Sequence, residues 1–159
     1  MLTSIHLTRK ARLISLLLVL ILGLALVFAT STAFADGGAR TLSATLTGAA
    51  EVPGPADPDG SGVSSIVLNP GEGRVCFKIS VSDILLPAIG AHIHVGTADV
   101  AGPVVVPLTP PDESGISKGC MSGVDPGLIR AIGQNPAGYY VNVHTTDFPA
   151  GAVRGQLSK

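Results

Sequence analysis

Residues 139–157 read YYVNVHTTDFPAGAVRGQL, and residues 91–95 read AHIHV. Residues 140–144 and 91–95 alternate, in that every second side chain is aliphatic and the side chains between are His, Asn or Tyr. Successive side chains of a strand point to opposite faces, so each stretch predicts a β-strand with histidine on one face and aliphatic residues on the other. Together they hold His92, His94 and His144, three of the four histidines in the chain.

The first 35 residues have the layout of a secretory signal peptide. A basic segment, an apolar run and a small-x-small cleavage site follow one another: Arg9, Lys10 and Arg12, then Leu13–Phe28, then Ala33-Phe34-Ala35. The alternative is an uncleaved anchor, because residues 13–35 carry no charge and are long enough to span a bilayer. We therefore expect a secreted or cell-envelope protein, with membrane anchoring through residues 13–35 as the alternative.

Removal of this segment leaves residues 36–159, enough for one domain. That part has seven basic against eleven acidic residues, hence a net charge of −4, which argues against nucleic acid as a partner. Cys76 and Cys120 are the only cysteines, and an even count in an oxidising compartment predicts a disulfide between them. A thiol metal ligand or redox pair is the alternative, which the lack of a Cys-x-x-Cys motif disfavours.

Short β-type runs, separated by Gly and Pro, recur at intervals of about ten residues, the spacing of a β-sandwich or barrel. The expected strands are residues 41–47, 63–68, 74–82, 91–95, 104–108, 116–121, 139–144 and 152–157. One short helix is expected over Pro126–Gln134, with Asp125 as its N-cap and Pro126 at the first helical position. The sequence therefore predicts an all-β domain of about eight strands with one short helix.

These segments, in this order, resemble the CHRD domain family, named for its repeats in chordin. The matching residues are Leu42–Gly48 with Glu51-Val52-Pro53, Gly62, Ala91–His94, Gly102–Val105, Tyr140–Thr145, Pro149, Gly151 and Arg154–Leu157. The resemblance covers residues 41–157, as the core of a domain at 36–159. It implies an antiparallel, immunoglobulin-like β-sandwich that acts as an extracellular or cell-envelope binding or structural module, with no established catalytic activity. Its partner would be an extracellular or envelope protein or ligand, which the resemblance does not identify.

Arg154 is expected to have a structural role. A lone arginine in an alternating strand usually donates to backbone carbonyls or to a carboxylate, for which Glu51 and Asp147 are candidates. The chain departs from the family at Ala152-Val153, where the family more often has an acid followed by an aliphatic residue. This departure removes one possible carboxylate partner of Arg154.

The histidines are candidate metal ligands. His92 and His94 leave the same face of one strand, and Tyr140, Asn142 and His144 share a face of another. If the two strands are neighbours, three imidazoles converge, which would suit one copper or zinc ion. The alternative is that the histidines hold loops through hydrogen bonds, with Asn142 and Thr145 among their partners.

The His-x-His pattern on a β-sandwich is also similar to copper/zinc superoxide dismutase, but only locally. That enzyme's two-metal site uses six histidines and an aspartate, whereas residues 36–159 have three histidines. Kinship of fold is compatible with this count, and shared activity does not follow from it.

Two further motifs are interpreted as chance matches. Gly115–Gly119 fits Gly-x-Ser-x-Gly, but no helical pattern follows, as a nucleophile elbow requires. Residues 57–62 resemble the start of a calcium loop, yet Leu68 stands where a bidentate Glu belongs. Weak calcium binding through Glu51, Asp57 and Asp59 is the alternative to a solvated acidic turn. No complete catalytic constellation is present, so we do not expect an enzyme. Contact with a membrane is expected only through the N-terminal segment, if it is retained.

Overall fold

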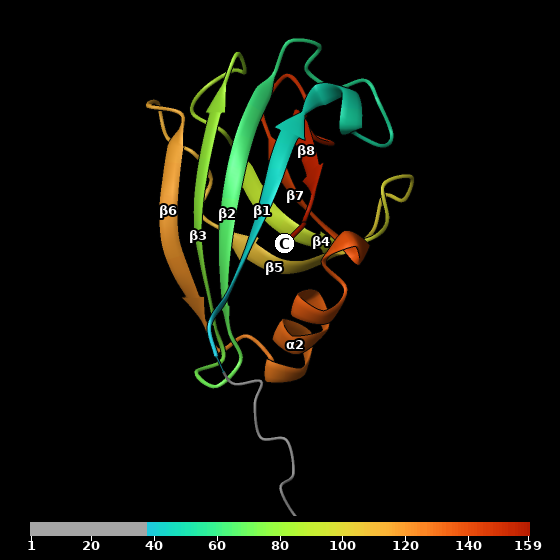
Figure 1. Cartoon of the computed structure of the whole chain (residues 1–159). Helices are drawn as coiled ribbons and strands as arrows, with labels where there is room; N and C mark the ends of the chain where they lie inside the picture. The colour runs from blue at the N-terminus through green and yellow to red at the C-terminus, as the bar shows by residue number, and fades with distance from the viewer. Residues whose placement is uncertain (1–37) are drawn as a thin grey trace, which may run out of the picture. The chain divides into compact units, whose positions relative to one another are not determined.

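The computed structural model describes residues 38–159 (Figure 1). The predicted signal peptide or anchor lies outside the described residues. Between residues 38 and 159 the chain forms eight strands, one α-helix and two 3-10 turns. In chain order they are β1 (Arg40–Thr47), η2 (Gly48–Ala50), β2 (Ser61–Asn69), β3 (Arg74–Ser82), β4 (Gly90–Val95), β5 (Val104–Leu108), β6 (Ile116–Ser122), α2 (Pro126–Gln134), η3 (Pro136–Gly138), β7 (Tyr139–His144) and β8 (Val153–Gln156).

The strands form one antiparallel sheet with the order β5-β4-β7-β8-β1-β2-β3-β6. The sheet folds over itself, so that β1, β2, β3 and β6 lie in front of β8, β7, β4 and β5 (Figure 1). The two end strands approach each other where Ser117 Oγ donates a hydrogen bond of 2.6 Å to the Thr109 carbonyl. The predicted all-β, antiparallel fold is confirmed, as two facing layers that are continuous from β8 to β1 and nearly closed at β5 and β6.

The core lies between the layers and is filled by the inward-facing residue of each alternating pair. In β3 the pattern is strict, with the even-numbered residues half-buried or exposed and the odd-numbered residues buried. The core side chains of the strands are Leu42, Ala44, Leu46, Ile66, Leu68, Val75, Phe77, Ile79, Val81, Ala91, Ile93, Val106, Leu108, Val141, Val143 and Val153. Burying such aliphatic side chains contributes roughly 1.5–3 kcal/mol each, which makes this layer contact the main source of stability.

Helix α2 covers one end of the layers (Figure 1). The Asp125 carboxylate accepts a hydrogen bond of 2.8 Å from the Leu128 N–H and so caps the helix as predicted. Ile129 and Ile132 are buried in the core. Near the other end of the helix, Arg40 Nη1 donates to the Gly133 carbonyl at 2.7 Å, which ties α2 to the first strand.

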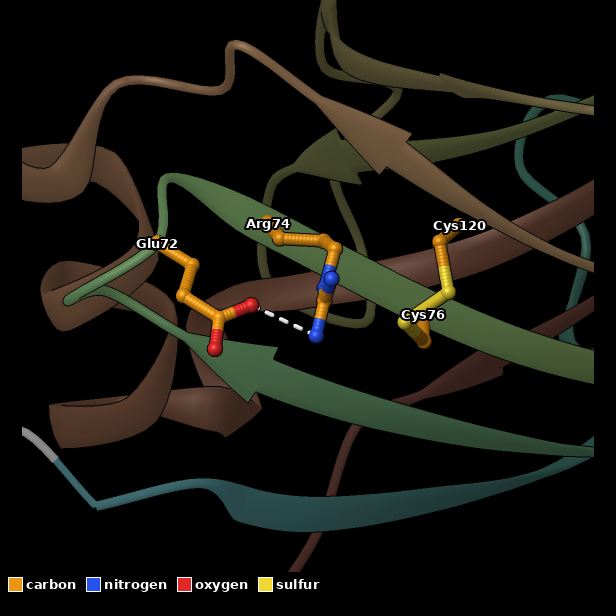
Figure 2. Close-up of a disulfide and its surroundings, with 4 residues drawn as sticks. All are labelled: Glu72, Arg74, Cys76 and Cys120. Atoms are coloured by element: carbon orange, nitrogen blue, oxygen red, sulfur yellow. Dashed lines mark ion pairs between the residues drawn. A yellow bond between two sulfur atoms is a disulfide. The ribbon is translucent and has the colours of Figure 1, made fainter.

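Cys76 on β3 and Cys120 on β6 are joined by a disulfide on the outer face of the front layer (Figure 2). The two residues are direct partners in the strand register, so the bridge links β3 to the end strand of the sheet. Within residues 38–159 no helix has the length and apolar character needed to cross a membrane.

Candidate metal centre

The three histidines lie together because β4 and β7 are neighbours in the sheet. In the antiparallel register His92 faces Asn142, His94 faces Tyr140, and Gly90 faces His144. The aliphatic residues between them, Ile93 and Val143 among them, fill the core. The polar side chains therefore all lie on the outer face of the same strand pair.

The imidazole rings form a compact triangle. Their ring centroids are 5.0 Å apart for His92 and His144, 5.5 Å for His92 and His94, and 6.2 Å for His94 and His144. One ring nitrogen from each histidine lies within 4.8 Å of the other two, and within the described residues no other cluster of His, Cys, Asp or Glu side chains brings three potential ligand atoms so close. Tetrahedral ligation at about 2.1 Å per bond would place such nitrogens about 3.4 Å apart, so the rings would have to approach one another to bind a common ion.

Hydrogen bonds to the main chain determine which ring nitrogen of each histidine keeps a lone pair that could bind a metal. Nδ1 of His94 donates to the Gly102 carbonyl at 2.8 Å, and Nδ1 of His144 donates to the Pro149 carbonyl at 3.1 Å. In a neutral imidazole the other nitrogen then carries a lone pair, so Nε2 of both rings is an acceptor. His92 Nδ1 lies 3.1 Å from His144 Nε2 and is the donor in that pair.

His94 Nε2 is buried and has no hydrogen-bond partner. The His94 side chain is only 8 % exposed, so water does not readily replace the missing partner. An unpaired buried acceptor costs about 1–3 kcal/mol. A ligand at this nitrogen would remove that cost, and main-chain carbonyls that hold Nδ1–H are the usual outer partners of metal-binding histidines.

His94 also belongs to a column of stacked side chains. Its ring is stacked on Tyr140, with centroids 4.8 Å apart and 11° between the planes. Arg154 lies over the ring of Tyr140, with its guanidinium carbon 3.4 Å from the ring centroid. Gly102 joins the column to a loop, because its N–H donates to Tyr140 Oη at 3.1 Å while its carbonyl accepts from His94.

Arg154 holds this covering loop in place. Its Nη2 donates to the carbonyls of Thr97 and Val100, at 2.7 and 3.1 Å. Gln156 extends the contact by donating to the Gly96 carbonyl at 2.9 Å. Arg154 thus donates to backbone carbonyls, one of the two kinds of partner that we expected, and also to Gln156 Oε1 at 3.3 Å. The expected carboxylate partners, Glu51 and Asp147, do not accept hydrogen bonds from Arg154.

Asn142 is occupied elsewhere. Its Nδ2 donates to both carboxylate oxygens of Glu51, at 3.0 and 2.9 Å, and Glu51 also accepts from the Val52 N–H at 3.2 Å. Thr145 Oγ1 accepts a hydrogen bond from the Phe148 N–H at 3.1 Å. Asn142 and Thr145 are thus not the partners that the alternative reading gave the histidines: the amide holds a buried carboxylate, and the hydroxyl shapes the 145–149 turn. The bonds of His94 and His144 to backbone carbonyls do match that reading.

The electrostatic surroundings favour neutral imidazoles. Burial lowers the pKa of His92, and the charges of His144 and His94 lower it further. Burial also lowers the pKa of His94 and of His144, more than their hydrogen bonds to Gly102 and Pro149 raise it. Burial raises the pKa of Glu51, although the Val52 N–H, the charge of Arg154 and the bond from Asn142 oppose this. All three rings can therefore offer a lone pair near neutral pH.

The two chance motifs have structural roles. Ser117, the centre of the Gly-x-Ser-x-Gly match, lies in strand β6 and not in a sharp turn. Residues 57–62 run into strand β2, and the expected solvated turn holds for the exposed Pro58 and Asp59 but not for Asp57, which is 8 % exposed. The Asp57 N–H bonds the Ala152 carbonyl at 3.2 Å, which fixes the loop against the start of β8. Glu51 makes its hydrogen bonds to Asn142 and Val52, away from any calcium loop.

Two glycines, Gly90 and Gly102, stand where a side chain would crowd the histidine rings or collide with strand β4. A Cβ on Gly90 would lie 3.2 Å from the His92 ring and 3.3 Å from the His144 ring, so glycine leaves room for both. A Cβ on Gly102 would overlap the Val95 carbonyl oxygen. Gly102 is among the residues that carry the family resemblance, but the sequence did not show that it touches Val95, and Gly90 had no signal beyond its place before the His-x-His stretch.

A comparison with protein-family models matches the CHRD domain over residues 42–157. The match spans most of the chain and nearly all of the described domain, so the chain belongs to the CHRD domain family. No curated protein and no solved structure gave a significant match. Membership supports a binding or structural module, and both the family and the disulfide are consistent with export.

Proposed function

We propose that the protein is an exported binding module of the extracellular space or cell envelope, without catalytic activity, and that its three-histidine centre binds one Cu²⁺ or Zn²⁺ ion. The export part rests on the signal-peptide pattern of residues 1–35 and on the disulfide. An extracellular protein or ligand would be the partner of the module.

The observation that carries the metal proposal is the buried, unpartnered Nε2 of His94 beside two further imidazoles. The proposed ligand atoms are His94 Nε2, His144 Nε2 and His92 Nδ1. In the metal-free site the lone pair of His144 Nε2 accepts a hydrogen bond from His92 Nδ1–H. Metal binding would replace that proton, and the His92 ring would carry its hydrogen on Nε2 instead.

The ligand set also limits the choice of metal. Three neutral imidazoles without a carboxylate suit copper or zinc, and not calcium or magnesium, which prefer oxygen ligands. His92 and His144 are partly exposed, so a fourth position open to solvent is available on that side. A water or a group from a partner molecule could complete the coordination there.

Calorimetric titration of chelator-treated protein near pH 7.5 tests the proposal. We expect about one equivalent of Zn²⁺ or Cu²⁺ to bind, and His144→Ala to weaken binding as strongly as His92→Ala. Thr146 is exposed and lies two residues from His144, so the Thr146→Ala variant is the matched control and should bind the metal like the wild type. Absence of saturable binding in the wild type would reject the metal centre and leave the histidines as packing residues.

A further inference from the structure

The disulfide lies in a part of the molecule that the proposed function does not use. Cys120 is exposed on β6, the end strand of the sheet, and Cys76 is half-buried on β3. An external thiol can therefore approach the Cys120 sulfur from the open side of the end strand. Access to the sulfur is one of the factors that decide whether a disulfide exchanges with thiols.

Basic residues surround the bridge on the same face. Lys78 and Lys118 are direct partners in the register, two residues along from the Cys76–Cys120 pair. Arg74 lies on the other side of Cys76 (Figure 2). Residues i and i+2 of a strand are about 6.7 Å apart and share a face. The Cys76 sulfur therefore leaves its strand between two cations of that strand.

Few negative charges offset these cations. None of the four front strands, β1, β2, β3 and β6, contains an acidic residue, although residues 36–159 carry a net charge of −4. Glu72 pairs with Arg74 at 2.5 Å, and both side chains are largely exposed (Figure 2). Lys78 and Lys118 are therefore the main source of positive potential at the bridge.

We propose that Cys76–Cys120 is a thiol–disulfide exchange site for an external dithiol, with Cys120 as the attacked sulfur and Cys76 as the leaving thiolate. The thiolate of the reductant attacks Cys120 Sγ, the Cys76–Cys120 bond breaks, and Cys76 departs as a thiolate that takes up a proton from water. The second thiol of the reductant then attacks the mixed disulfide and releases Cys120. Two cysteine thiols and one oxidised reductant result, so the electrons balance. Lys78 and Lys118 stabilise the leaving thiolate and attract the attacking one.

Exchange at this place has a structural consequence. Like charges directly opposite each other in an antiparallel pair are destabilising, and Lys78 and Lys118 form such a pair. The covalent bridge holds β6 to β3 against that repulsion. Reduction removes the restraint and loosens β6, which lies at the end of the sheet with only β3 as its paired strand among the described residues.

The rate of reduction by dithiothreitol at pH 7 and low salt tests the site. We expect Lys78→Gln and Lys118→Gln each to slow reduction about two- to fivefold, and salt to slow the wild type. Lys159→Gln removes an exposed positive charge beyond the last strand and should leave the rate unchanged. Circular dichroism of each oxidised variant verifies the fold. Equal rates in the wild type, Lys78→Gln and Lys118→Gln would overturn the role of the lysines.

The direction of attack needs a second measurement. Brief treatment with a monothiol, followed by alkylation with iodoacetamide and peptide mass spectrometry, identifies the sulfur that carries the adduct. The proposal requires the adduct on Cys120 and the alkyl group on Cys76. The reverse distribution, or an equal mixture, would overturn it, because the leaving group would then not be set by the cations on β3.

Discussion

The rings of His94 and Tyr140 lie parallel, 11° apart in plane and 4.8 Å between centroids, although the two residues come from different strands. Arg154 covers the opposite side of the tyrosine. One column of three side chains therefore connects a candidate ligand to the loop that Arg154 holds. Its members can be removed one at a time.

Tyr140→Phe and Tyr140→Leu separate the parts of this column. The phenylalanine keeps the stacked ring but loses the oxygen that accepts from Gly102 N–H, so we expect a loss of about 1 kcal/mol of unfolding free energy. The leucine also loses the stacking and the cation–π contact, and should cost roughly 2–4 kcal/mol. Urea unfolding measures both. Equal losses in the two variants would contradict a role for the ring itself.

The pKa shifts of the histidines predict a pH dependence of stability. Burial holds the pKa of His92, His94 and His144 below the ordinary value of about 6.5 that applies to the unfolded chain. Their contribution is complete above pH 6.5 and is lost as the pH falls, because the unfolded chain then binds more protons. We therefore expect the urea concentration at the unfolding midpoint to decrease when the pH is lowered from 7.5 to 5.5.

Glu51 acts in the opposite sense and provides the control. Its raised pKa means that the folded protein binds the proton more tightly, which favours folding as the pH falls through the acidic range. The Glu51→Gln variant lacks this stabilising proton uptake. As the pH is lowered, the stability of the variant should therefore decrease at least as steeply as that of the wild type. A urea midpoint in the wild type that is constant or rises from pH 7.5 to pH 5.5 would contradict the prediction.

Removal of the disulfide should cost stability. The bridge joins residues 44 positions apart, and chain-entropy reasoning gives about 4 kcal/mol for a loop of that length. The variant Cys76→Ala with Cys120→Ala should therefore unfold at a much lower urea concentration while it keeps the β-rich circular dichroism spectrum. A loss below about 1 kcal/mol would show that the pairing of β3 with β6 already restrains the chain as strongly as the bridge does.

Gly102→Ala should disturb both the fold and the histidine site. A methyl group at this position would overlap the Val95 carbonyl oxygen, so the loop has to move away from β4. His94 and Tyr140 would then lose their contacts with Gly102, and we expect a loss of at least 2 kcal/mol and weaker metal binding. Gly38→Ala, where nothing lies within 4 Å, is the control and should change the stability by less than about 0.5 kcal/mol.

The strand pattern could be predicted because it follows from local alternation. In β7 the valines at 141 and 143 had to share a face, which left Tyr140, Asn142 and His144 on the other. The same logic predicted β3, and the N-cap Asp125 predicted the start of α2. The convergence of the histidines depended on β4 and β7 being neighbours, which alternation alone does not determine.

The partners of the polar side chains could not be predicted. Glu51 and Asn142 are 91 residues apart, and Arg154 bonds main-chain carbonyls of a loop more than fifty residues away. Backbone carbonyls are present at every residue, so the sequence carries no mark of which ones a side chain will reach. Chemical type suggested backbone carbonyls or a carboxylate for Arg154, and the loop geometry selected the carbonyls of Thr97 and Val100.

The two faces of β4 and β7 carry separate tasks, since the aliphatic residues hold the layers together and the polar residues form the histidine site. Substitutions at the half-buried His92 and His144 therefore leave the aliphatic core untouched, whereas Tyr140 and Asn142 on the same face are buried. A different side chain at position 92 or 144 would change the set of ligands while β4 and β7 keep their aliphatic contacts with the core. The strand pair is for the same reason a promising scaffold for engineering new coordination chemistry.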